Sequence, residues 1–346
     1  MAPTPQEPDT PIAVRAVGSI GDDTALLRIP DADPVARDRM PLPLPPPPRR
    51  WARPGAAMGA EAADDVAIAG AVRTLGVGSR TVAVIGAKGG VGATTTALLA
   101  GALLAAVPEA RPVLVELAAD WGTTGQVLGA GDGPTVADLL AHLTAAHRGG
   151  LGLVQGFTVP WCRVPVLLAP RDPALVARLT PTDYARAHRL LAAHYGLVLL
   201  DCGPSLTHPL TRFALDVADH IVLVTGPDAA ALHGAHTALQ LLTKPSLTGG
   251  LASVALDRNP PRIGPHAPTD LTLVINGADA TVTRVFDAPF GKEVMPTLNA
   301  VLTVPRSEPL RQQFAAGGAS VETLPTPIRR ALKTVLATIL RRLTHV

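Results

Sequence analysis

The sequence has few of the residues that mark several classes of protein. Only two cysteines occur among its 346 residues, Cys162 and Cys202, and their separation matches neither a disulfide framework nor a metal-binding spacing. Aromatic residues make up 3% of the chain, too few for the stacking surface of a single-strand nucleic-acid binder. A net charge of +2 gives no global attraction to nucleic acid or membrane. We therefore expect a protein of the reducing cytoplasm with no clear nucleic-acid signature.

Export and membrane insertion are not expected either. The N-terminus lacks a basic region followed by an apolar core, which is the pattern of a secretory signal. The longest apolar stretch, residues 97–107, is too short to span a bilayer. Apolar residues make up 47% of the chain, which is enough for a large core. We expect a soluble protein.

Residues 1–58 differ from the rest and are expected to form a proline-rich, mostly disordered tail. Thirteen of the 35 prolines precede Gly55, and four of them are consecutive at 45–48. Such a run adopts the polyproline II helix, which serves as a spacer or as a ligand for the aromatic groove of a protein partner. A passive linker is the commoner use. Residues 12–17 and 24–29 have the pattern of a small hairpin, but two strands alone are marginally stable.

Residues 59–346 alternate helical patterns with short apolar runs. The expected strands are 82–85, 112–117, 164–168, 197–200, 220–225, 271–275 and 301–304. The expected helices before the last strands are 61–75, 94–106, 134–146, 180–194, 206–217 and 229–242. Continuous apolar strands in βα repetition predict a parallel sheet with helices on both faces. We therefore expect one doubly wound α/β domain over residues 59–346.

The stretch at 82–96, Val-Ala-Val-Ile-Gly-Ala-Lys-Gly-Gly-Val-Gly-Ala-Thr-Thr-Thr, organises the domain. A β-branched strand pattern leads into a glycine-rich turn, and a helical pattern begins at Thr94. A helix N-terminus behind such a turn binds anions, because free backbone N–H groups and the helix dipole point at one spot. Glycine lets the backbone approach a phosphate and take positive φ, and the turn contains Gly89, Gly90 and Gly92. Thr94 occupies the place of the magnesium-binding hydroxyl of a P-loop.

One P-loop residue is missing. The usual loop ends in Gly-Lys-Ser/Thr, and here Ala93 takes the place of that lysine, while Lys88 precedes the double glycine. The resulting layout, Lys-Gly-Gly-x-Gly-x-Thr-Thr, resembles the deviant Walker A motif of the MinD/ParA family of P-loop ATPases. The alternative is a chance glycine-rich turn.

The resemblance implies that ATP and Mg2+ are bound and that Lys88 reaches across an ATP-dependent homodimer to the partner's phosphates. The nucleotide-binding residues that it implies on this loop are Lys88, Gly89, Gly90, Val91, Gly92, Ala93, Thr94 and Thr95.

Two further elements resemble the same family. The run 197–200 ends in Asp201, and a carboxylate at the carboxyl end of a core strand is where a Walker B Asp holds Mg2+, usually through water. The alternative is a buried Asp that caps the next helix. The run 273–277, Leu-Val-Ile-Asn-Gly, resembles the family's strand that ends in Asn-Arg. By that resemblance Asn276 contacts adenine, although Gly277 departs from the pattern.

A third element weakens the case for an enzyme. In the family, the strand after the P-loop helix ends in Asp-x-Asp, and the second Asp orients the attacking water. The matching residues here are Glu116, Leu117 and Ala118. Asp120 would substitute only if its loop bent back. Loss of a charge-neutralising or water-positioning group costs about a hundredfold or more in rate, so we expect ATP binding to outlast hydrolysis, and the sequence leaves open whether ATP is hydrolysed at all.

Two functions from different classes remain open. The first is a nucleotide-dependent dimeric switch that positions or recruits a partner in partitioning, septum placement, secretion or pilus assembly. The second is a pseudo-ATPase scaffold whose proline-rich tail makes protein contacts with little or no nucleotide. The stretches 134–140, 172–174 and 182–184 are similar to actinobacterial ParA-like proteins associated with type VII secretion. The Gly-Ala-Thr loop is also found in the TadZ/CpaE branch.

The last helical pattern, residues 327–343, is amphipathic. Its apolar stripe consists of Ile328, Leu332, Val335, Leu336, Ile339 and Leu343. Its basic residues are Arg329, Arg330, Lys333, Arg341 and Arg342. We expect this helix to cover the sheet, because a doubly wound domain needs a helix over each sheet face. The alternative is peripheral contact of Ile328–Leu343 with an anionic membrane at the inner face of the plasma membrane, the use that MinD makes of its last helix.

Overall fold

The structure is a computed structural model that describes residues 60–76, 78–117, 124–131, 133–243, 266–279 and 297–345. All of these lie in the second of the two units into which the chain divides, Pro47–Val346. The predicted tail, its polyproline run and its hairpin lie outside the described residues, as do Ala118 and Asp120.

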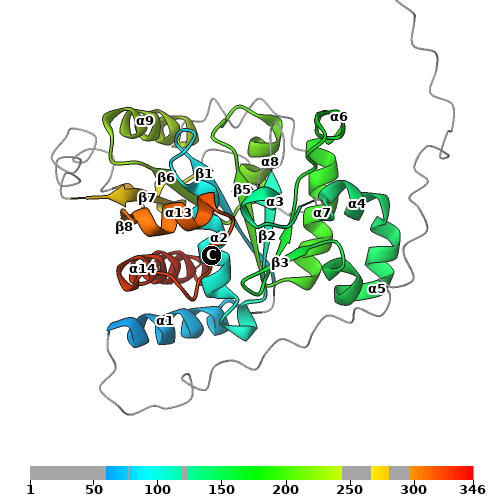
Figure 1. The fold of residues 1–346 in the computed structure, drawn as a ribbon, viewed down its shortest axis with the longest axis horizontal. Coiled ribbons are helices and arrows are strands. Elements are labelled where there is room, and N and C mark those ends of the chain that lie inside the picture. The colour runs from blue at the N-terminus through cyan, green and yellow to red at the C-terminus, as the bar shows by residue number, and fades with distance from the viewer. Residues whose placement is uncertain are drawn as a thin grey trace, which may run out of the picture. The chain divides into compact units, whose positions relative to one another are not determined.

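In the described part of the chain, eight strands form one sheet in the order β3-β4-β2-β5-β1-β6-β7-β8 (Figure 1). The strands are β1 (Arg80–Gly86), β2 (Pro112–Leu117), β3 (Val159–Trp161), β4 (Val164–Leu167), β5 (Leu197–Cys202), β6 (His220–Thr225), β7 (Leu271–Ala278) and β8 (Ala300–Pro305). Neighbouring strands are parallel except β3, which is antiparallel to β4. The predicted parallel α/β fold is confirmed.

Helices cover both faces of this sheet and form two hydrophobic cores. The α-helices are α1 (Ala60–Thr74), α2 (Ala93–Leu104), α3 (Thr124–Val127), α4 (Val136–Ala141), α5 (Leu143–Gln155), α6 (Pro173–Val176), α7 (Pro181–His194), α8 (Pro209–Val217), α9 (Ala229–Thr243), α13 (Glu308–Ala315) and α14 (Thr326–Leu343). Side chains from α4, α7, α8 and α9 fill the first core, and side chains from α1, α2, α13 and α14 fill the second. Alternate residues of each central strand therefore belong to opposite cores, which is why these strands are apolar throughout.

Two features differ from the sequence prediction. The predicted helix at 134–146 is broken at His142 into α4 and α5, and Gly150 takes a positive φ of 65° inside α5. The short hairpin β3–β4 was not predicted. Its turn residues Cys162 and Arg163 have positive φ values of 44° and 70°, and neither residue type signals such a turn, which favours Asn or Gly.

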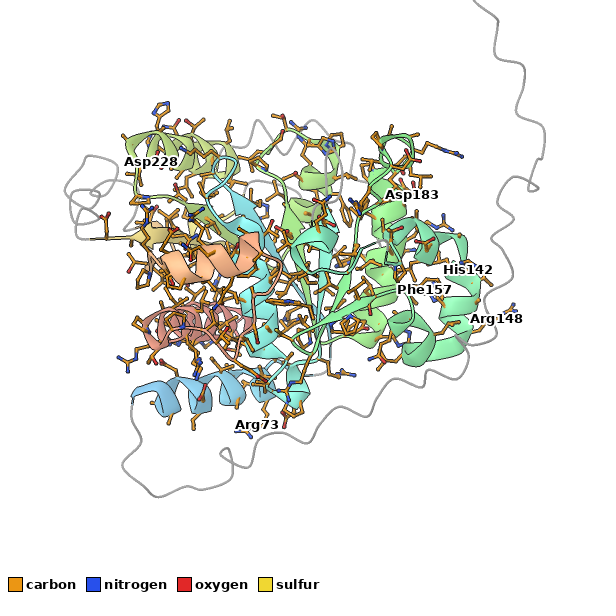
Figure 2. All side chains as sticks on the ribbon, viewed as in Figure 1. Arg73, His142, Arg148, Phe157, Asp183 and Asp228 are labelled. Carbon is orange, nitrogen blue, oxygen red and sulfur yellow. The ribbon has the colours of Figure 1, made fainter. Side chains whose placement is uncertain are left out.

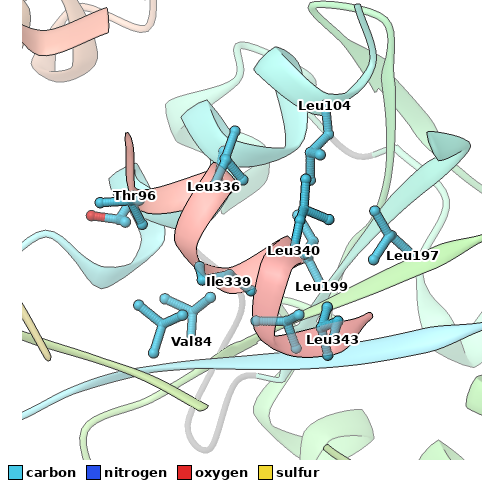
Figure 3. A pocket seen from close by; sticks show the side chains of 13 residues that line it. Val84, Thr96, Leu104, Leu197, Leu199, Leu336, Ile339, Leu340 and Leu343 are labelled. Atoms are coloured by element: carbon cyan, nitrogen blue, oxygen red, sulfur yellow. The ribbon is translucent and has the colours of Figure 1, made fainter. Parts of the chain in front are cut away.

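The helix α14 packs as the last element of the fold. Its whole predicted apolar stripe is buried, and the helix contacts α1, α2 and β8. Figure 3 shows its leucines and Ile339 around a small apolar cavity that Thr96 and Leu199 also line.

The burial of this stripe favours the expected role of α14 as a cover of the sheet, and the membrane alternative stays a prediction. The apolar stripe faces the second core, and two of the basic residues are engaged within the fold. Lys333 Nζ lies 2.6 Å from Asp65 Oδ1 of α1, and Arg342 Nη2 lies 3.0 Å from Asp270 Oδ1. No helix in the described part of the chain combines the length and apolarity that a membrane span requires.

Candidate nucleotide-binding site

The glycine-rich loop joins the carboxyl end of β1 to the amino end of α2, at the edge of the sheet where α/β proteins bind their ligands. Gly90 and Gly92 have positive φ values of 79° and 89°, which only glycine adopts without strain. A Cβ atom at Gly92 would also collide with the Asn276 amide nitrogen. The loop therefore requires glycine at both positions, as the sequence analysis predicted for close backbone approach.

The first turn of α2 offers its backbone N–H groups to this loop. Its N-cap is Gly92, which has no side chain to satisfy them. The Thr96 hydroxyl donates to the carbonyl of Gly92 at 2.8 Å and so closes the first turn, while Thr94 and Thr95 are half-buried. An uncapped helix N-terminus that follows a loop of positive-φ glycines is an anion-binding arrangement.

Asp201 lies at the end of β5 and is buried, 5% exposed. The Thr94 hydroxyl donates a hydrogen bond to its carboxylate. Burial raises the pKa of this carboxyl to about 7, the hydrogen bond from Thr94 lowers it, and the nearby charge of Glu116 raises it. The other oxygen, Asp201 Oδ1, is buried without a hydrogen-bond partner among the described residues.

The orphaned oxygen and the Thr94 hydroxyl are hard donors that suit Mg2+, which dehydrates reluctantly and binds through one or two protein groups plus phosphate oxygens and water. In the described residues, no cluster of three or more His, Cys, Asp or Glu side chains is placed to hold a metal by itself. These two residues therefore fit Mg2+ that arrives with a nucleotide and do not form a protein-only metal cage.

Glu116 stands beside Asp201 in the adjacent parallel strand β2, in direct register. It is 5% exposed. Its Oε1 accepts hydrogen bonds from the Thr124 backbone N–H at 2.9 Å and from the Thr124 hydroxyl at 2.6 Å, and its Oε2 accepts one from the Ala169 N–H at 3.0 Å. Sequence reasoning identified Glu116 only as the residue in place of an Asp. Its partners Thr124 and Ala169 lie 8 and 53 positions further along the chain, beyond the reach of a local sequence pattern.

Lys88 is exposed at the rim of the loop. Its Nζ lies 3.1 Å from Asp228 Oδ1, at the amino end of α9, where Figure 2 labels Asp228. Asp228 also accepts the Ala231 N–H at 2.9 Å, and this bond, together with the hydrogen bond from Lys88, lowers the pKa of its carboxyl. The sequence analysis did not identify Asp228 as part of the site.

Asn276 lies near the end of β7, and its amide donates to the Val91 carbonyl at 2.9 Å. The structure thus places it against the glycine-rich loop, and its contact with adenine stays a prediction. Gly277 has a positive φ of 73°, which explains why glycine stands where the family has Arg.

The structure brings most of the predicted site residues together at the carboxyl ends of β1, β5 and β7. Ala93 is half-buried, and its side chain packs against the second core.

No family model matches the chain. Over 165 residues it is 30% identical to the ESX-1 secretion-associated protein EspI of Mycobacterium tuberculosis, a match that covers 48% of this chain and 24% of EspI. Over 161 residues it is 35% identical to the chromosome-partitioning ATPase Soj of Thermus thermophilus, covering 45% of this chain and 58% of Soj. The chain thus spans about a quarter of EspI and a little over half of Soj.

Solved structures extend the likeness over most of the chain. A ParA family ATPase from Chlorobium tepidum covers 75% of this chain and 98% of its own, with a TM-score of 0.59 and 17% identity. MinD from Pyrococcus horikoshii, complexed with Mg-ADP, covers 75% of this chain and 94% of its own, with a TM-score of 0.51 and 18% identity. The chain has the ParA/MinD fold. The resemblance of the sequence to the MinD/ParA family is confirmed.

Within the ParA/MinD fold, the glycine-rich loop of this chain follows the central strand β1, and its Asp201 ends the neighbouring strand β5. The departures from the family pattern are therefore local. They are Ala93 in the loop, and Glu116 at the end of β2 with Ala118 after it.

Proposed function

We propose that this chain binds ATP with Mg2+ and acts as a nucleotide-dependent dimeric switch that positions or recruits a partner. The single observation that carries the proposal is the pair Thr94 and Asp201. Their side chains meet at the amino end of α2, and a buried carboxylate oxygen is left without a described partner beside an uncapped helix terminus. A scaffold that had lost nucleotide binding would have no need for a buried, unsatisfied carboxylate, because such a group costs stability.

The chain's own residues divide the binding between them. Backbone N–H groups of the loop and the first turn of α2 receive the phosphates. Thr94 and Asp201 hold Mg2+, which neutralises phosphate charge when bound. Asn276 contacts adenine by the family resemblance. MinD of Pyrococcus horikoshii has been seen with Mg-ADP, and the related Cyanothece McdA with ATP, which supports the same ligand class here.

Lys88 is the residue proposed to act across the dimer. It is 44% exposed at the rim of the loop, and its partner Asp228 is 55% exposed. Exposed ion pairs contribute little, because water and salt screen them and both side chains lose freedom. The side chain of Lys88 is therefore able to leave Asp228 and reach a phosphate held by a second copy.

Hydrolysis is proposed to be very slow. Ala93 supplies no cation near the phosphates, and Glu116 is engaged by Thr124 and Ala169, so its carboxylate is not available to orient a water. We expect turnover in the purified protein to be barely above background.

The lack of a lysine at Ala93 and the engagement of Glu116 by Thr124 and Ala169 also favour the second candidate, a pseudo-ATPase scaffold. Its distinguishing property is a lack of Mg2+-dependent nucleotide binding.

The partner is proposed to be a protein. The match to EspI, a secretion-associated protein, favours a partner in secretion, and the match to Soj favours partitioning. Residues 1–58, with the polyproline run, are the proposed ligand for that partner, and residues 59–346 the nucleotide-binding domain in the cytoplasm.

Self-association tests the switch. The molar mass of the full chain in solution, measured by light scattering, should double with ATP and Mg2+ and stay unchanged with ADP. Lys88→Ala should abolish the doubling. Arg73→Ala, which removes another exposed cation far from the loop on α1, is the matched control and should dimerise like wild type. A molar mass that does not change when ATP is added, or that doubles equally in Lys88→Ala, would contradict the proposed dimer.

A further inference from the structure

Glu116 is a charged residue in an otherwise apolar buried strand. Pro112–Leu117 are all buried, and the carboxylate of Glu116 is kept inside by three hydrogen bonds. Two come from Thr124, the first residue of α3, and one comes from Ala169, which follows β4. Both partners are buried as well, Thr124 being 1% exposed and Ala169 2% exposed. A buried carboxylate needs such partners, because an unpaired one is strongly destabilising.

The position of these bonds is specific. Glu116 lies between Val115 and Leu117, whose side chains belong to the first core. Because successive side chains of a strand point to opposite faces, the side chain of Glu116 projects to the other face of the sheet, on which α2 packs. Asp201 lies in register on the next strand and projects to the same face, since its neighbours Leu200 and Cys202 belong to the first core. The two carboxylates are therefore neighbours, and Glu116 ties α3 and the end of β4 to the flank of the Thr94–Asp201 pair.

We propose that Glu116 is a positioning residue of the nucleotide site. Through its hydrogen bonds it holds Thr124, at the amino end of α3, and Ala169, two residues after β4, beside Asp201. These two held residues form a wall of the site, and this wall makes the site prefer Mg-ATP to Mg-ADP. The inference rests on the proposed nucleotide binding. It assigns Glu116 no contact with the nucleotide.

The strand order supports this role. A nucleotide on the loop after β1 has β5 and then β2 on one side. Residues held at the ends of β2 and β4 therefore border the phosphates on that side, next to Asp201. The α- and β-phosphates of a bound nucleotide would lie against the loop and the first turn of α2, whereas the hydrogen bonds of Glu116 go to Thr124 and Ala169. Loss of the wall should thus affect the γ-phosphate more than the rest of the nucleotide.

Three variants separate this role from a general structural one. Glu116→Gln replaces one accepting oxygen by an N–H2 donor, so that Thr124 or Ala169 loses its acceptor. Glu116→Asp keeps the charge but is one methylene too short to hold both partners. Thr124→Val removes only the hydroxyl donor. Thr158→Val is the matched control, because the Thr158 hydroxyl is also buried in the fold and donates to a backbone carbonyl, that of Gln155, at 2.8 Å.

The first readout needs no nucleotide. Amide hydrogen exchange in the free full-length protein should quicken at Thr124 and Ala169 in both Glu116 variants, by about tenfold or more, and stay unchanged in Thr158→Val. The second readout is the affinity of each variant for Mg-ATP and for Mg-ADP, by fluorescent-nucleotide competition. Loss of a hydrogen bond to a buried charge should lower the ATP-to-ADP affinity ratio by about tenfold, with ADP affinity nearly constant.

The outcomes are distinct. Equal losses for ATP and ADP, or an unchanged ratio despite faster exchange, would leave Glu116 a purely structural residue and overturn the inference. Wild type that binds neither nucleotide would overturn the proposed function and this inference together. If Glu116→Gln does not fold, Glu116→Asp and Thr124→Val decide, and an unchanged ratio in both overturns the proposal.

Discussion

Lys88 Nζ and Asp228 Oδ1 lie 3.1 Å apart, although the two residues are 140 positions apart in the sequence. The pair joins the glycine-rich loop to the amino end of α9. It means that the lysine proposed to act on a second copy is held by a carboxylate of its own chain.

Asp228→Asn should raise the affinity for Mg-ATP. Asparagine keeps the N-cap of α9, which rests on the bond to the Ala231 N–H, but it removes the charge that competes for Lys88. The gain should be small, about twofold to fivefold, because exposed ion pairs are weak. Titration with a fluorescent ATP analogue measures it. Asp172→Asn is the matched control, since Asp172 caps α6 in the same way through the Ala174 N–H. A weaker affinity in Asp228→Asn would show that Asp228 assists binding.

Gly92→Ala and Gly89→Ala form a matched pair within the loop. Gly92 has a φ of 89° and lies against Asn276, whereas a Cβ at Gly89 would meet no atom within 4 Å. Alanine at 92 is therefore expected to cost on the order of 1–3 kcal/mol of folding free energy from backbone strain alone, and to abolish nucleotide binding. Alanine at 89 should leave the melting temperature nearly unchanged. Equal melting temperatures for the two variants would contradict the loop geometry.

Asp201→Asn should change how stability depends on pH in the metal-free protein. The folded pKa of Asp201, about 7, is raised above its ordinary value of 3.8. A raised pKa means that the folded protein holds the proton more tightly, so the stability from this group is complete below pH 4 and is lost as pH rises through 7.

Urea unfolding in a chelator is the measurement. Asp201→Asn carries no charge at any pH, so it should match wild type only below about pH 4. Its stability advantage over wild type should be small near pH 5 and larger at pH 8. An equal stability difference at both pH values would mean that the carboxyl of Asp201 does not titrate in this range.

Leu340→Ala should destabilise the domain by about 2–5 kcal/mol, the usual cost of a leucine removed from a core. Leu340 is 1% exposed, and it lines the cavity between α14, α2 and the sheet, so the loss enlarges an existing void. Arg341→Ala, at the exposed neighbouring position, should change stability little. Chemical denaturation compares the two variants. If α14 were a detached membrane helix, both would unfold like wild type.

The sequence predicted the sheet well because its strands are buried on both faces. Runs such as 220–225 and 112–117 coincide with β6 and β2, since a continuous apolar run between turn residues has few other uses. The break at His142 was missed because the apolar spacing of α4 and α5 continues across it. There the His142 ring stacks on Phe157, with ring centroids 5.5 Å apart. That contact lies 15 residues away and leaves no local pattern.

The site was predictable to the extent that it lies on one short motif. The loop, Thr94 and Asp201 follow from residue types at the ends of predicted strands. Asp228 and Glu116 do not, because their roles depend on partners that only the folded chain brings near. The otherwise continuous apolar run of β2 marks Glu116 as a charge in a buried strand, and that is the one signal from which its importance could have been inferred.

Calorimetric titration of the full-length protein with ATP, with and without Mg2+, tests the central claim most directly. We expect Mg2+-dependent binding with a dissociation constant in the micromolar to millimolar range, roughly −4 to −8 kcal/mol. Asp201→Ala should weaken it, and Ala93→Lys, which restores the usual P-loop lysine, should tighten it. No Mg2+-dependent heat at millimolar ATP would contradict the nucleotide switch and leave the scaffold as the function of this chain.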